Sequence, residues 1–298
     1  MVKISEIRAL VSLLADEDPR ITDMVWERLS GMGADALPAL RAACEDTDPV
    51  LRLRARHALD ILAFEQLEDD LRDIAEADDI DFPLERALHA LDQIEYPELP
   101  LDRIRRPLDA LAERIRPRLA GKRRPADRLE EMHVVLHREL RFAPVSRAAS
   151  DPQAFFLHRV LERKAGAPVL LAAVYLLVAR RLGLSLTGVS LPSHILLRLD
   201  GGETEVFLDP ARGGVPFGRR ECVQTYLRDY FPRDAYVHAA SGRDLVIRGV
   251  RGLMLLYARV QDRMRSRRLG RVLEILQARE RARQRGGCGY PFASGTDS

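Results

Sequence analysis

The sequence has few cysteines, almost no lysine and no long hydrophobic run, and these shortages exclude several classes of protein. Its three cysteines, Cys44, Cys222 and Cys288, have no metal-ligand spacing and cannot pair into an even disulfide framework. The chain has neither an apolar stretch of membrane-spanning length nor a charged-then-apolar leader. We therefore expect a cytoplasmic protein without a membrane-inserted segment.

A strong net charge is also missing. The chain of 298 residues carries 47 Lys and Arg against 45 Asp and Glu, a formal net charge of +2. This balance by itself indicates neither a nucleic-acid binder nor a protein for acidic substrates. Only three of the basic residues are lysine, and we interpret the excess of arginine as coding bias. Hydrophobic residues make up 46% of the chain, which is enough to build cores for two domains.

Residues 1–62 contain an internal repeat. Each of two repeats reads as a helix, an Asp-x-Asp-Pro turn and a second helix, in which Asp can cap and Pro can open the following helix. This pattern looks like a short HEAT-type helical repeat, and a generic pair of helical hairpins is the alternative. Two such repeats bury too little surface to stand alone, so we expect residues 1–65 to pack on the adjoining part of the chain. The residues that recur one repeat later are Leu10, Asp16, Asp18, Pro19 and Leu29.

Two segments have strongly unequal charge. Residues 60–81 hold ten acidic residues against Arg72, and residues 246–285 hold twelve arginines against three acidic residues. Both compositions are typical of the solvated faces of amphipathic helices. We expect the two segments to attract each other in the fold. The arginine-rich segment lacks interleaved aromatic residues beyond Tyr257 and a known binding motif, so it does not indicate nucleic-acid binding.

The middle of the chain is predicted to form helices and then a sheet. The helix at 168–182 is the most apolar, with Pro168 in its first turn and Gly183 as its stop. Helices followed by an antiparallel sheet indicate a mostly helical α+β fold. The predicted helices cover 84–94, 101–119, 126–140, 153–164, 168–182 and 220–230, and the predicted strands lie at 185–190 and in two arms between 191 and 210.

Residues 191–210 are predicted to form a β-hairpin that turns at Gly201-Gly202, because glycine accepts the positive φ angles of a tight turn. Directly opposed residues in a hairpin have Cβ atoms about 5 Å apart, so an imidazole can reach a carboxylate. The sequence therefore predicts a His and an Asp side by side at the far end of the hairpin. A two-residue loop at the glycines would pair Arg198 with Glu205, Leu196 with Phe207 and His194 with Asp209.

Five segments match, in order and spacing, segments of a known bacterial family. The chain resembles the SirB-type transglutaminase-like family over roughly residues 66–240, in the segments 88–97, 160–168, 174–184, 188–194 and 209–214. The resemblance implies a transglutaminase-like, papain-like core at 66–245, followed by a tetratricopeptide-like helix pair at 246–285. The HEAT-like front at 1–65 departs from the family pattern, and we expect residues 286–298 to be a disordered tail.

The catalytic machinery of such enzymes has three parts: a Cys at the N-terminus of a buried helix, a His on an adjacent strand and an Asp that orients the His. By the resemblance, His194 corresponds to the His and Asp209 to the Asp. The nucleophile position corresponds to the start of the helix at 168, where residues 165–171 contain no thiol and no hydroxyl. SirB-type relatives generally lack the Cys and often have a Ser slightly further in, but that position is apolar here. The family's Asn-Ser pair before the preceding helix corresponds to Ala154-Phe155.

A catalytic thiol would have to come from elsewhere, and Cys222 is the candidate. It lies at the start of the predicted helix 220–230, where a thiol can gain thiolate character; the alternative is a small buried core residue. Three interpretations of His194 and Asp209 stay open. They are a relic pair that holds the sheet or shapes a ligand groove, a working acid–base pair, or a chance cross-strand pair.

Metal binding is not indicated by the histidines. His133 and His137 are i,i+4 neighbours on one helix face and could share a metal only if a third ligand met them. The sequence offers no such ligand in view. We therefore predict neither a metal nor a cofactor.

Two hypotheses of different class account for these features. The one we favour is a non-catalytic interaction or regulatory protein, a transglutaminase-like pseudoenzyme flanked by helical repeats, which commonly present protein-binding surfaces. The alternative is a Cys- or His/Asp-dependent hydrolase or transferase that acts on peptide or amide bonds. We expect protein partners, and neither nucleic acid nor membrane; the oligomeric state stays open.

Overall fold

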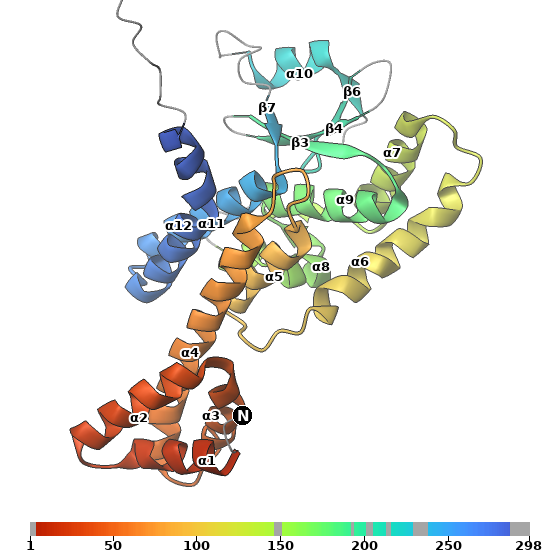
Figure 1. Cartoon of the computed structure of the whole chain (residues 1–298). Coiled ribbons are helices and arrows are strands. Elements are labelled where there is room, and N and C mark those ends of the chain that lie inside the picture. Colours follow the sequence, from red (N-terminus) through yellow and green to blue (C-terminus); the bar gives the residue numbers. More distant parts are fainter. Residues whose placement is uncertain are drawn as a thin grey trace, which may run out of the picture. The chain divides into compact units, whose positions relative to one another are not determined.

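The computed structural model describes residues 4–145, 151–191, 194–200, 205–212, 216–228 and 238–286 (Figure 1). The chain divides into two compact units, Met1–Asp70 and Leu71–Ser298, and each is described by itself. The predicted boundaries after residues 65 and 245 stay predictions. The predicted tail at 286–298 lies, apart from Gly286, outside the described residues.

The first unit consists of helices joined by short turns. Its two Asp-x-Asp-Pro turns share a hydrogen-bond pattern: Asp16 accepts from the N–H of Asp18 (2.8 Å), and Asp46 accepts from the N–H of Asp48 (3.0 Å). Asp18 and Asp48 each accept from the N–H two residues further on, which caps the helix after the turn. The repeat in the sequence is therefore also a repeat in local structure. The helices are α1 (Ile4–Ser12), α2 (Pro19–Met32), α3 (Leu37–Ala43) and α4 (Pro49–Glu76), with 3-10 turns at Leu13–Ala15 and Gly33–Ala36.

The core of the first unit joins the two repeats. Leu29 is fully buried there, and Cys44 is buried in the same cluster. The Arg54 guanidinium donates to the carbonyls of Leu14 and Asp16, both at 2.7 Å. These bonds hold α4 against the turn of the first repeat.

The helices predicted for the second unit are confirmed, with three local changes. The helix predicted at 220–230 is shorter, because α10 ends at Tyr226. The predicted helix at 126–140 begins as α7 and continues after His133 as a π-helical stretch, Val134–Glu139. The predicted helix at 153–164 begins as a 3-10 turn, Pro152–Phe155, before α8. The helices are α5 (Leu84–Gln93), α6 (Asp102–Ile115, then a 3-10 turn at Arg116–Leu119), α7 (Pro125–His133), α8 (Leu157–Arg163), α9 (Pro168–Leu182), α10 (Arg219–Tyr226), α11 (Gly242–Arg259) and α12 (Arg263–Gly286).

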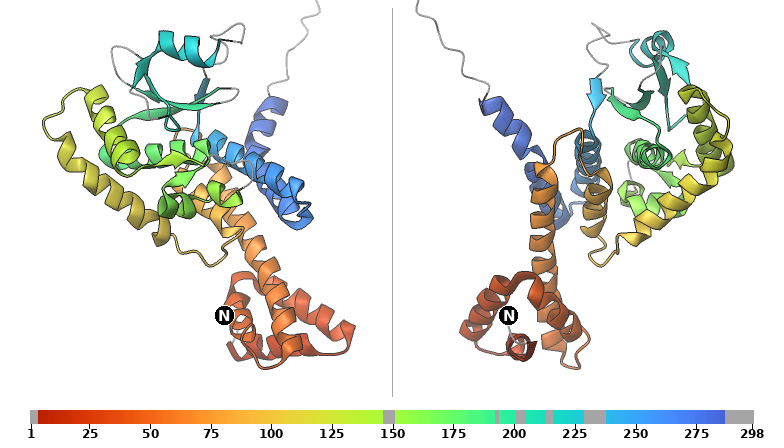
Figure 2. Two further views of the ribbon diagram at one scale, coloured as in Figure 1. Left: turned by 180° about the vertical axis from the view of Figure 1, so that it is seen from behind. Right: turned by 45° about the vertical axis from the view of Figure 1, so that its right-hand side comes forward.

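Helix α9 lies at the centre of the second unit (Figure 2). It starts at Pro168 and stops at Gly183, which adopts a left-handed conformation (φ 66°), so its predicted bounds are confirmed. Helices α5, α6, α8 and α11 contact it, as do strands β3 (Leu186–Ser190) and β4 (Ile195–Leu199). Each fully buried Leu or Val contributes about 1.5–3 kcal/mol relative to exposure, so α9 is a main source of stability for this unit.

The main sheet is antiparallel, with the strand order β6-β5-β4-β3-β7. It confirms the mostly helical α+β class, the strand predicted at 185–190 and the two arms of the hairpin. The sequence did not predict the short outer strands or a separate two-residue parallel pair, β1 with β2. The remaining strands are β1 (Ala143–Pro144), β2 (Ala165–Gly166), β5 (Val206–Leu208), β6 (Phe217–Gly218) and β7 (His238–Ala240).

The predicted register of the hairpin is wrong by two residues. Arg198 pairs with Phe207, and Leu199 pairs with Val206, so neither Leu196 with Phe207 nor His194 with Asp209 is a directly opposed pair. Because the shift is even, each side chain keeps its predicted face of the sheet. The predicted turn at Gly201-Gly202 lies outside the described residues.

Asp200 explains the shift in register. Its N–H donates to the carbonyl of Ser185 (3.0 Å), and its carboxylate accepts from the hydroxyl of Thr187. Both partners belong to the β3 side, so Asp200 extends the pairing with β3 and does not close a two-residue turn. The predicted ion pair of Arg198 with Glu205 is nevertheless present at 3.9 Å, because long side chains can span a diagonal pair.

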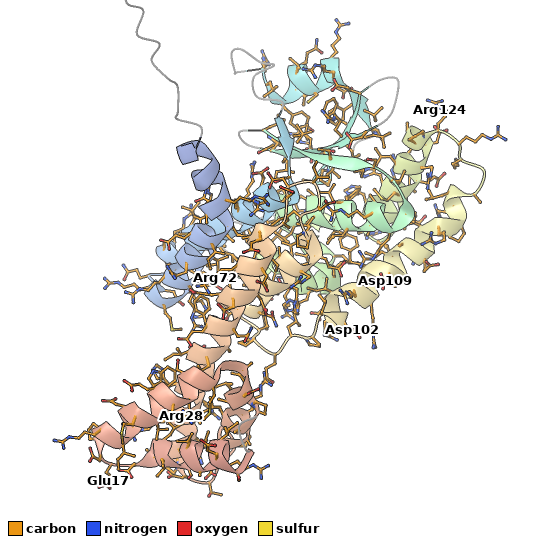
Figure 3. The ribbon with its side chains drawn as sticks, in the orientation of Figure 1. Glu17, Arg28, Arg72, Asp102, Asp109 and Arg124 are labelled. Carbon is orange, nitrogen blue, oxygen red and sulfur yellow. The ribbon has the colours of Figure 1, made fainter. Side chains whose placement is uncertain are left out.

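Charged side chains connect the acidic segment to the C-terminal helices. Arg279 on α12 donates to the carbonyl of Glu76 and pairs with Asp78, which confirms the predicted attraction at this point. Arg243 on α11 pairs with Asp79 at 2.9 Å. Elsewhere, Asp109 on α6 (Figure 3) pairs with Arg181 of α9 at 2.6 Å. In the described ranges, no helix has both the length and the apolar character that crossing a bilayer requires.

Candidate functional site

The start of α9 is the position to which the resemblance assigns the nucleophile, and it is apolar. The helix is preceded by Ala167, which has no side chain that could cap it, and Pro168 occupies its first turn. Ala167, Val169, Leu170 and Leu171 are buried, while Pro168 is exposed. The backbone of this turn points its N–H groups outward, but no side chain of residues 165–171 offers a sulfur or a hydroxyl oxygen.

His194 lies directly before β4, with its ring partly exposed. The ring of Tyr226 meets it edge to face, with 4.9 Å between the ring centroids. Burial lowers the pKa of His194; the Asp209 carboxylate opposes this effect, and the Arg212 and Arg248 guanidinium groups add to it. The imidazole is therefore neutral at physiological pH.

Asp209 is only 4% exposed, and its carboxylate is held by groups other than His194. The Tyr226 hydroxyl donates to Oδ2 (2.9 Å), and the N–H of Ala211 donates to Oδ1 (2.8 Å). Arg212 Nε lies 4.0 Å from Oδ2. Among the described residues, no hydrogen bond joins the His194 ring to Asp209 or to a thiol or hydroxyl. The structure thus brings His194 and Asp209 to the same place, where each of them contacts Tyr226.

Tyr226 is a site residue that the sequence did not indicate. It comes from α10, and its ring stacks on Phe217 with 5.7 Å between centroids. Burial raises the pKa of Tyr226, and its contact with Asp209 raises it further. The phenol therefore keeps its proton and acts as a hydrogen-bond donor to the carboxylate.

Cys222 lies on α10 and is 0% exposed. Its thiol sits in an apolar cluster, where burial raises its pKa to about 11. A nucleophilic cysteine needs the opposite shift, so this thiol is protonated at neutral pH. The cluster also contains Val189, Leu191, Leu196, Phe207 and Leu227.

The two helix histidines are packed together and bonded to neighbours. Their rings are stacked, with 5.2 Å between centroids. His133 Nδ1 lies 2.9 Å from the Tyr175 hydroxyl, and His137 Nδ1 lies 3.1 Å from the carbonyl of Phe142. Within the described ranges, no three His, Cys, Asp or Glu side chains converge as a metal ion would require.

A buried polar pair next to α9 was also missed. Asp92 is 0% exposed; it accepts from His158 Nδ1 (2.7 Å) and from the N–H groups of Leu157 (2.7 Å) and His158 (2.8 Å). It thus caps α8 from another helix. Burial raises the pKa of Asp92, and its bonds with His158 oppose this. The signal available in the sequence was that Asp92 lies within the family-like segment 88–97.

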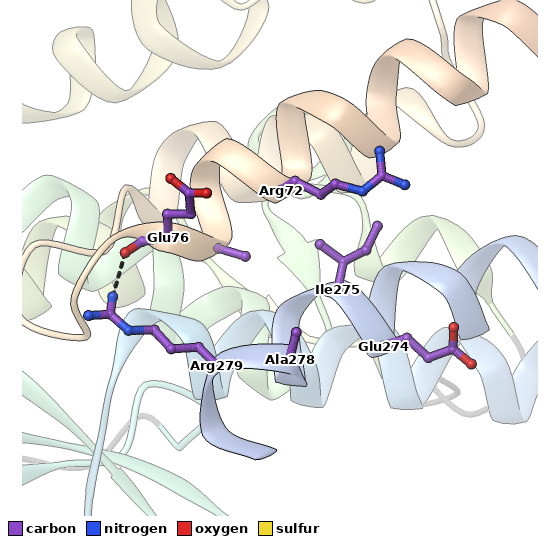
Figure 4. Close-up of a pocket in the computed structure, with 7 residues that line it drawn as sticks. Arg72, Glu76, Glu274, Ile275, Ala278 and Arg279 are labelled. Atoms are coloured by element: carbon purple, nitrogen blue, oxygen red, sulfur yellow. Dashed lines mark hydrogen bonds between the residues drawn. The ribbon is translucent and has the colours of Figure 1, made fainter. Parts of the chain in front are cut away.

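Two pockets of this unit differ in their charge. One, of about 420 Å³, opens at the start of α9 and is lined by Phe155, Ala167, Pro168, Val169, Ile195, Arg248, Arg251, Gly252, Leu255, Leu256 and Arg259. The other, of about 580 Å³, lies between the end of α4 and α12 (Figure 4). Its charged lining is balanced, with Arg72 and Arg279 against Glu76 and Glu274. The charged residues that line the first pocket are therefore all arginines, whereas those of the second have both signs.

Comparisons with known proteins cover part of this chain. The UPF0162 protein of Xylella fastidiosa (strain 9a5c) is 34% identical over 148 residues, which cover 47% of this chain and 53% of that protein. The UPF0162 protein of Vibrio cholerae is 28% identical over 133 residues, covering 44% and 47%. F-box only protein 21 of Homo sapiens is 36% identical over 81 residues, covering 27% and 13%. The chain thus spans about half the length of the bacterial relatives that it matches.

No solved structure matches the chain. A family model described as the transglutaminase-like superfamily matches residues 102–251, half of the chain. The matched segment contains α9, the hairpin, His194, Asp209 and Cys222. With its central helix, antiparallel sheet and His–Asp neighbourhood, the chain belongs to the transglutaminase-like superfamily.

Proposed function

We propose that this chain is a non-catalytic protein-interaction or regulatory protein, built on a transglutaminase-like core that has lost its nucleophile. The observation that carries the proposal is the apolar first turn of α9, where residues 165–171 supply no reactive sulfur or oxygen. Covalent catalysis of acyl transfer needs such an atom beside a general base. His194 has no such neighbour among the described residues.

The polar groups near His194 support a structural role. The Asp209 carboxylate accepts from the Tyr226 hydroxyl and from the N–H of Ala211, whereas no hydrogen bond joins it to the His194 ring among the described residues, so Asp209 does not orient the imidazole as a catalytic Asp would. Cys222 supports the same conclusion, because its raised pKa of about 11 leaves little thiolate at neutral pH. We interpret His194 and Asp209 as a relic pair that shapes the sheet and the adjoining groove.

The flanking segments extend the proposal to partners. We propose that residues 1–65 are HEAT-like repeats, that residues 246–285 are a tetratricopeptide-like helix pair, and that the core is of the SirB type. Repeats of both kinds commonly present protein-binding surfaces. The proposal includes the cytoplasmic location and the protein partner expected from the sequence.

The test is the reactivity of Cys222 toward iodoacetamide in the full chain, followed by peptide mass mapping. We expect the folded chain at pH 8 to label Cys222 roughly a hundredfold more slowly than the urea-unfolded chain, because a protonated, buried thiol is a poor nucleophile. His194→Ala should leave the rate unchanged. Cys44, a buried core thiol, serves as the internal reference. Fast labelling at neutral pH that depends on His194 would contradict the proposal.

A second candidate function is favoured by one observation, the neutral His194 imidazole beside the buried Asp209. A neutral imidazole can act as a general base on water without a thiol. This candidate is a His/Asp-dependent hydrolase of peptide or amide bonds. It requires amide hydrolysis by the full chain that is lost in both His194→Ala and Asp209→Asn.

A further inference from the structure

The pocket at the start of α9 is lined on one side by a single face of α11. Residues 248, 251, 252, 255 and 259 follow the three- and four-residue spacing that stacks side chains along one helix face. On the other side lie the first turn of α9, Phe155 and Ile195. The pocket is therefore built by elements far apart in the sequence, and it holds about 420 Å³.

The charge of this pocket is uniformly positive. Three arginines line it, and no Asp or Glu is among the lining residues. Arg248 uses Nη1 to donate to the Ser190 hydroxyl (3.3 Å) and to the carbonyl of Leu191 (3.1 Å). Within the described part of the chain, no carboxylate pairs with Arg248 or Arg251. Burial lowers the pKa of Arg248, because it destabilises the charged form of a guanidinium that has no carboxylate partner.

The walls between the arginines are apolar. Leu255 lies on the α11 face between Arg251 and Arg259 and is 64% exposed, so it offers apolar surface at the rim of the pocket. Phe155 forms the facing wall. It can approach because residue 252 is glycine; a Cβ there would lie 2.3 Å from the Phe155 ring.

We propose that this pocket docks a peptide segment of a partner protein that presents a carboxylate side chain beside an apolar one. The carboxylate would pair with Arg251 and Arg248, since guanidinium groups bind carboxylates through two parallel hydrogen bonds. The apolar side chain would cover Leu255 and Phe155. The positive end of the α9 dipole adds to the attraction for the carboxylate. The inference rests on the proposed interaction function and names the partner's chemistry.

The shape of the pocket favours a peptide over a nucleic acid. Single strands are bound along extended basic grooves with successive stacking platforms. Here the arginines surround one apolar pocket with a single aromatic wall, Phe155. Such a site holds one apolar side chain and its charged neighbour.

The test is a selection from a displayed library of random short peptides on the full chain. The selected peptides should share an Asp or Glu next to a Leu, Met or Phe. Arg251→Gln and Leu255→Ser, both at exposed positions, should each weaken the selected peptides about tenfold or more. The matched controls are Arg267→Gln, the same charge change at an exposed position on α12, and Met264→Ser, an exposed apolar side chain outside the pocket. Both controls should bind as the original chain does.

Three results would overturn the proposal. They are a selection without enrichment of acidic residues, equal losses in Arg251→Gln and Arg267→Gln, and retention of a single-stranded oligonucleotide that depends on Arg251. Circular dichroism of each variant separates lost binding from lost folding. The cysteine labelling test is independent of this one. A chain that labels slowly but selects no acidic peptide refutes the docking site alone, whereas a fast, His194-dependent thiol refutes the proposed function whatever peptides bind.

Discussion

The two faces of the sheet differ in the chemistry that they carry. Ile195 lines the pocket beside α9, while its neighbour Leu196 packs with Cys222, because successive residues of a strand point to opposite faces. Figure 1 shows α9 and α10 on opposite sides of β3 and β4. The α9 face has an apolar helix start and uniformly positive charge. The α10 face has the groups of catalytic type: His194, Asp209, Tyr226 and Cys222.

Under the proposed function, this separation would account for a thiol at Cys222 that does not replace the missing nucleophile. The field at the start of α9 acts within about the first helical turn, and Cys222 lies across the sheet from it. On its own face, the thiol is enclosed by apolar side chains, which raise its pKa. The polar groups of that face instead satisfy one another, as Tyr226 does for Asp209. Under the proposed function, the α9 face would keep the scaffold and the proposed docking pocket, and the α10 face would keep residue types found in catalytic sites without acting on a substrate.

The largest effect is expected on the α9 side, at Asp92. Asp92→Ala removes the acceptor of three hydrogen bonds at the start of α8 and leaves His158 buried without its partner. We expect a loss of about 3–5 kcal/mol in the free energy of unfolding, measured by urea titration. This loss would show that the buried Asp92 stabilises the start of α8, which packs against α9.

The control for Asp92 is Asp109→Ala on α6. Asp109 also pairs with a basic side chain, Arg181, but it is 61% exposed, and Arg181 keeps Glu85 at 2.7 Å. Exposed pairs contribute about 0–1 kcal/mol, so this variant should be nearly as stable as the original chain. If both variants lose the same free energy of unfolding, burial of Asp92 is not the reason for its contribution to stability.

A smaller effect is expected on the α10 side, at Tyr226. Tyr226→Phe leaves one oxygen of the buried Asp209 carboxylate without its donor, which should cost about 1–3 kcal/mol of stability. Tyr257→Phe is the matched control. Its hydroxyl lies 3.4 Å from Glu95, and Arg265 donates to both oxygens of that carboxylate (2.6 and 2.8 Å). If the two variants lose equal stability in urea titrations, the hydrogen bond from Tyr226 to Asp209 does not stabilise the fold as we expect.

Local signals in the sequence predicted much of the α9 face. Pro168 and Gly183 mark the ends of α9 by their own backbone preferences, so these bounds needed no tertiary information. The arms of the hairpin were predicted from the Gly201-Gly202 turn and the residue pairs that it implies. The register was not predicted, because it involves contacts of Asp200 with Thr187 of β3 and with Ser185, which directly precedes β3. The preference of two glycines for a tight turn could not reveal these contacts of Asp200.

The α10 face was less predictable, because its contacts are long-range. The sequence placed His194 and Asp209 near each other, but it did not indicate Tyr226, whose ring contacts His194 and whose hydroxyl reaches Asp209 only when α10 packs on the sheet. The pair of Asp92 and His158 joins residues from two helices and shows no periodic pattern. The positive pocket likewise appears only when α11 meets α9. The assignments of His194, Asp209 and Cys222 to catalytic roles stay predictions.

The smallest expected effect concerns the pH dependence contributed by His194. Its pKa is lowered by burial, so the unfolded chain takes up this proton first as the pH falls below about 6.5. The stability linked to His194 is therefore complete above about pH 6.5 and declines as the pH falls through the folded-state pKa. His194→Ala should flatten the decline of the urea midpoint as the pH falls below about 6.5. His194→Gln, which keeps a polar side chain that does not titrate, should flatten it equally. Curves parallel to that of the original chain would show that the α10 face does not oppose a positive charge at His194.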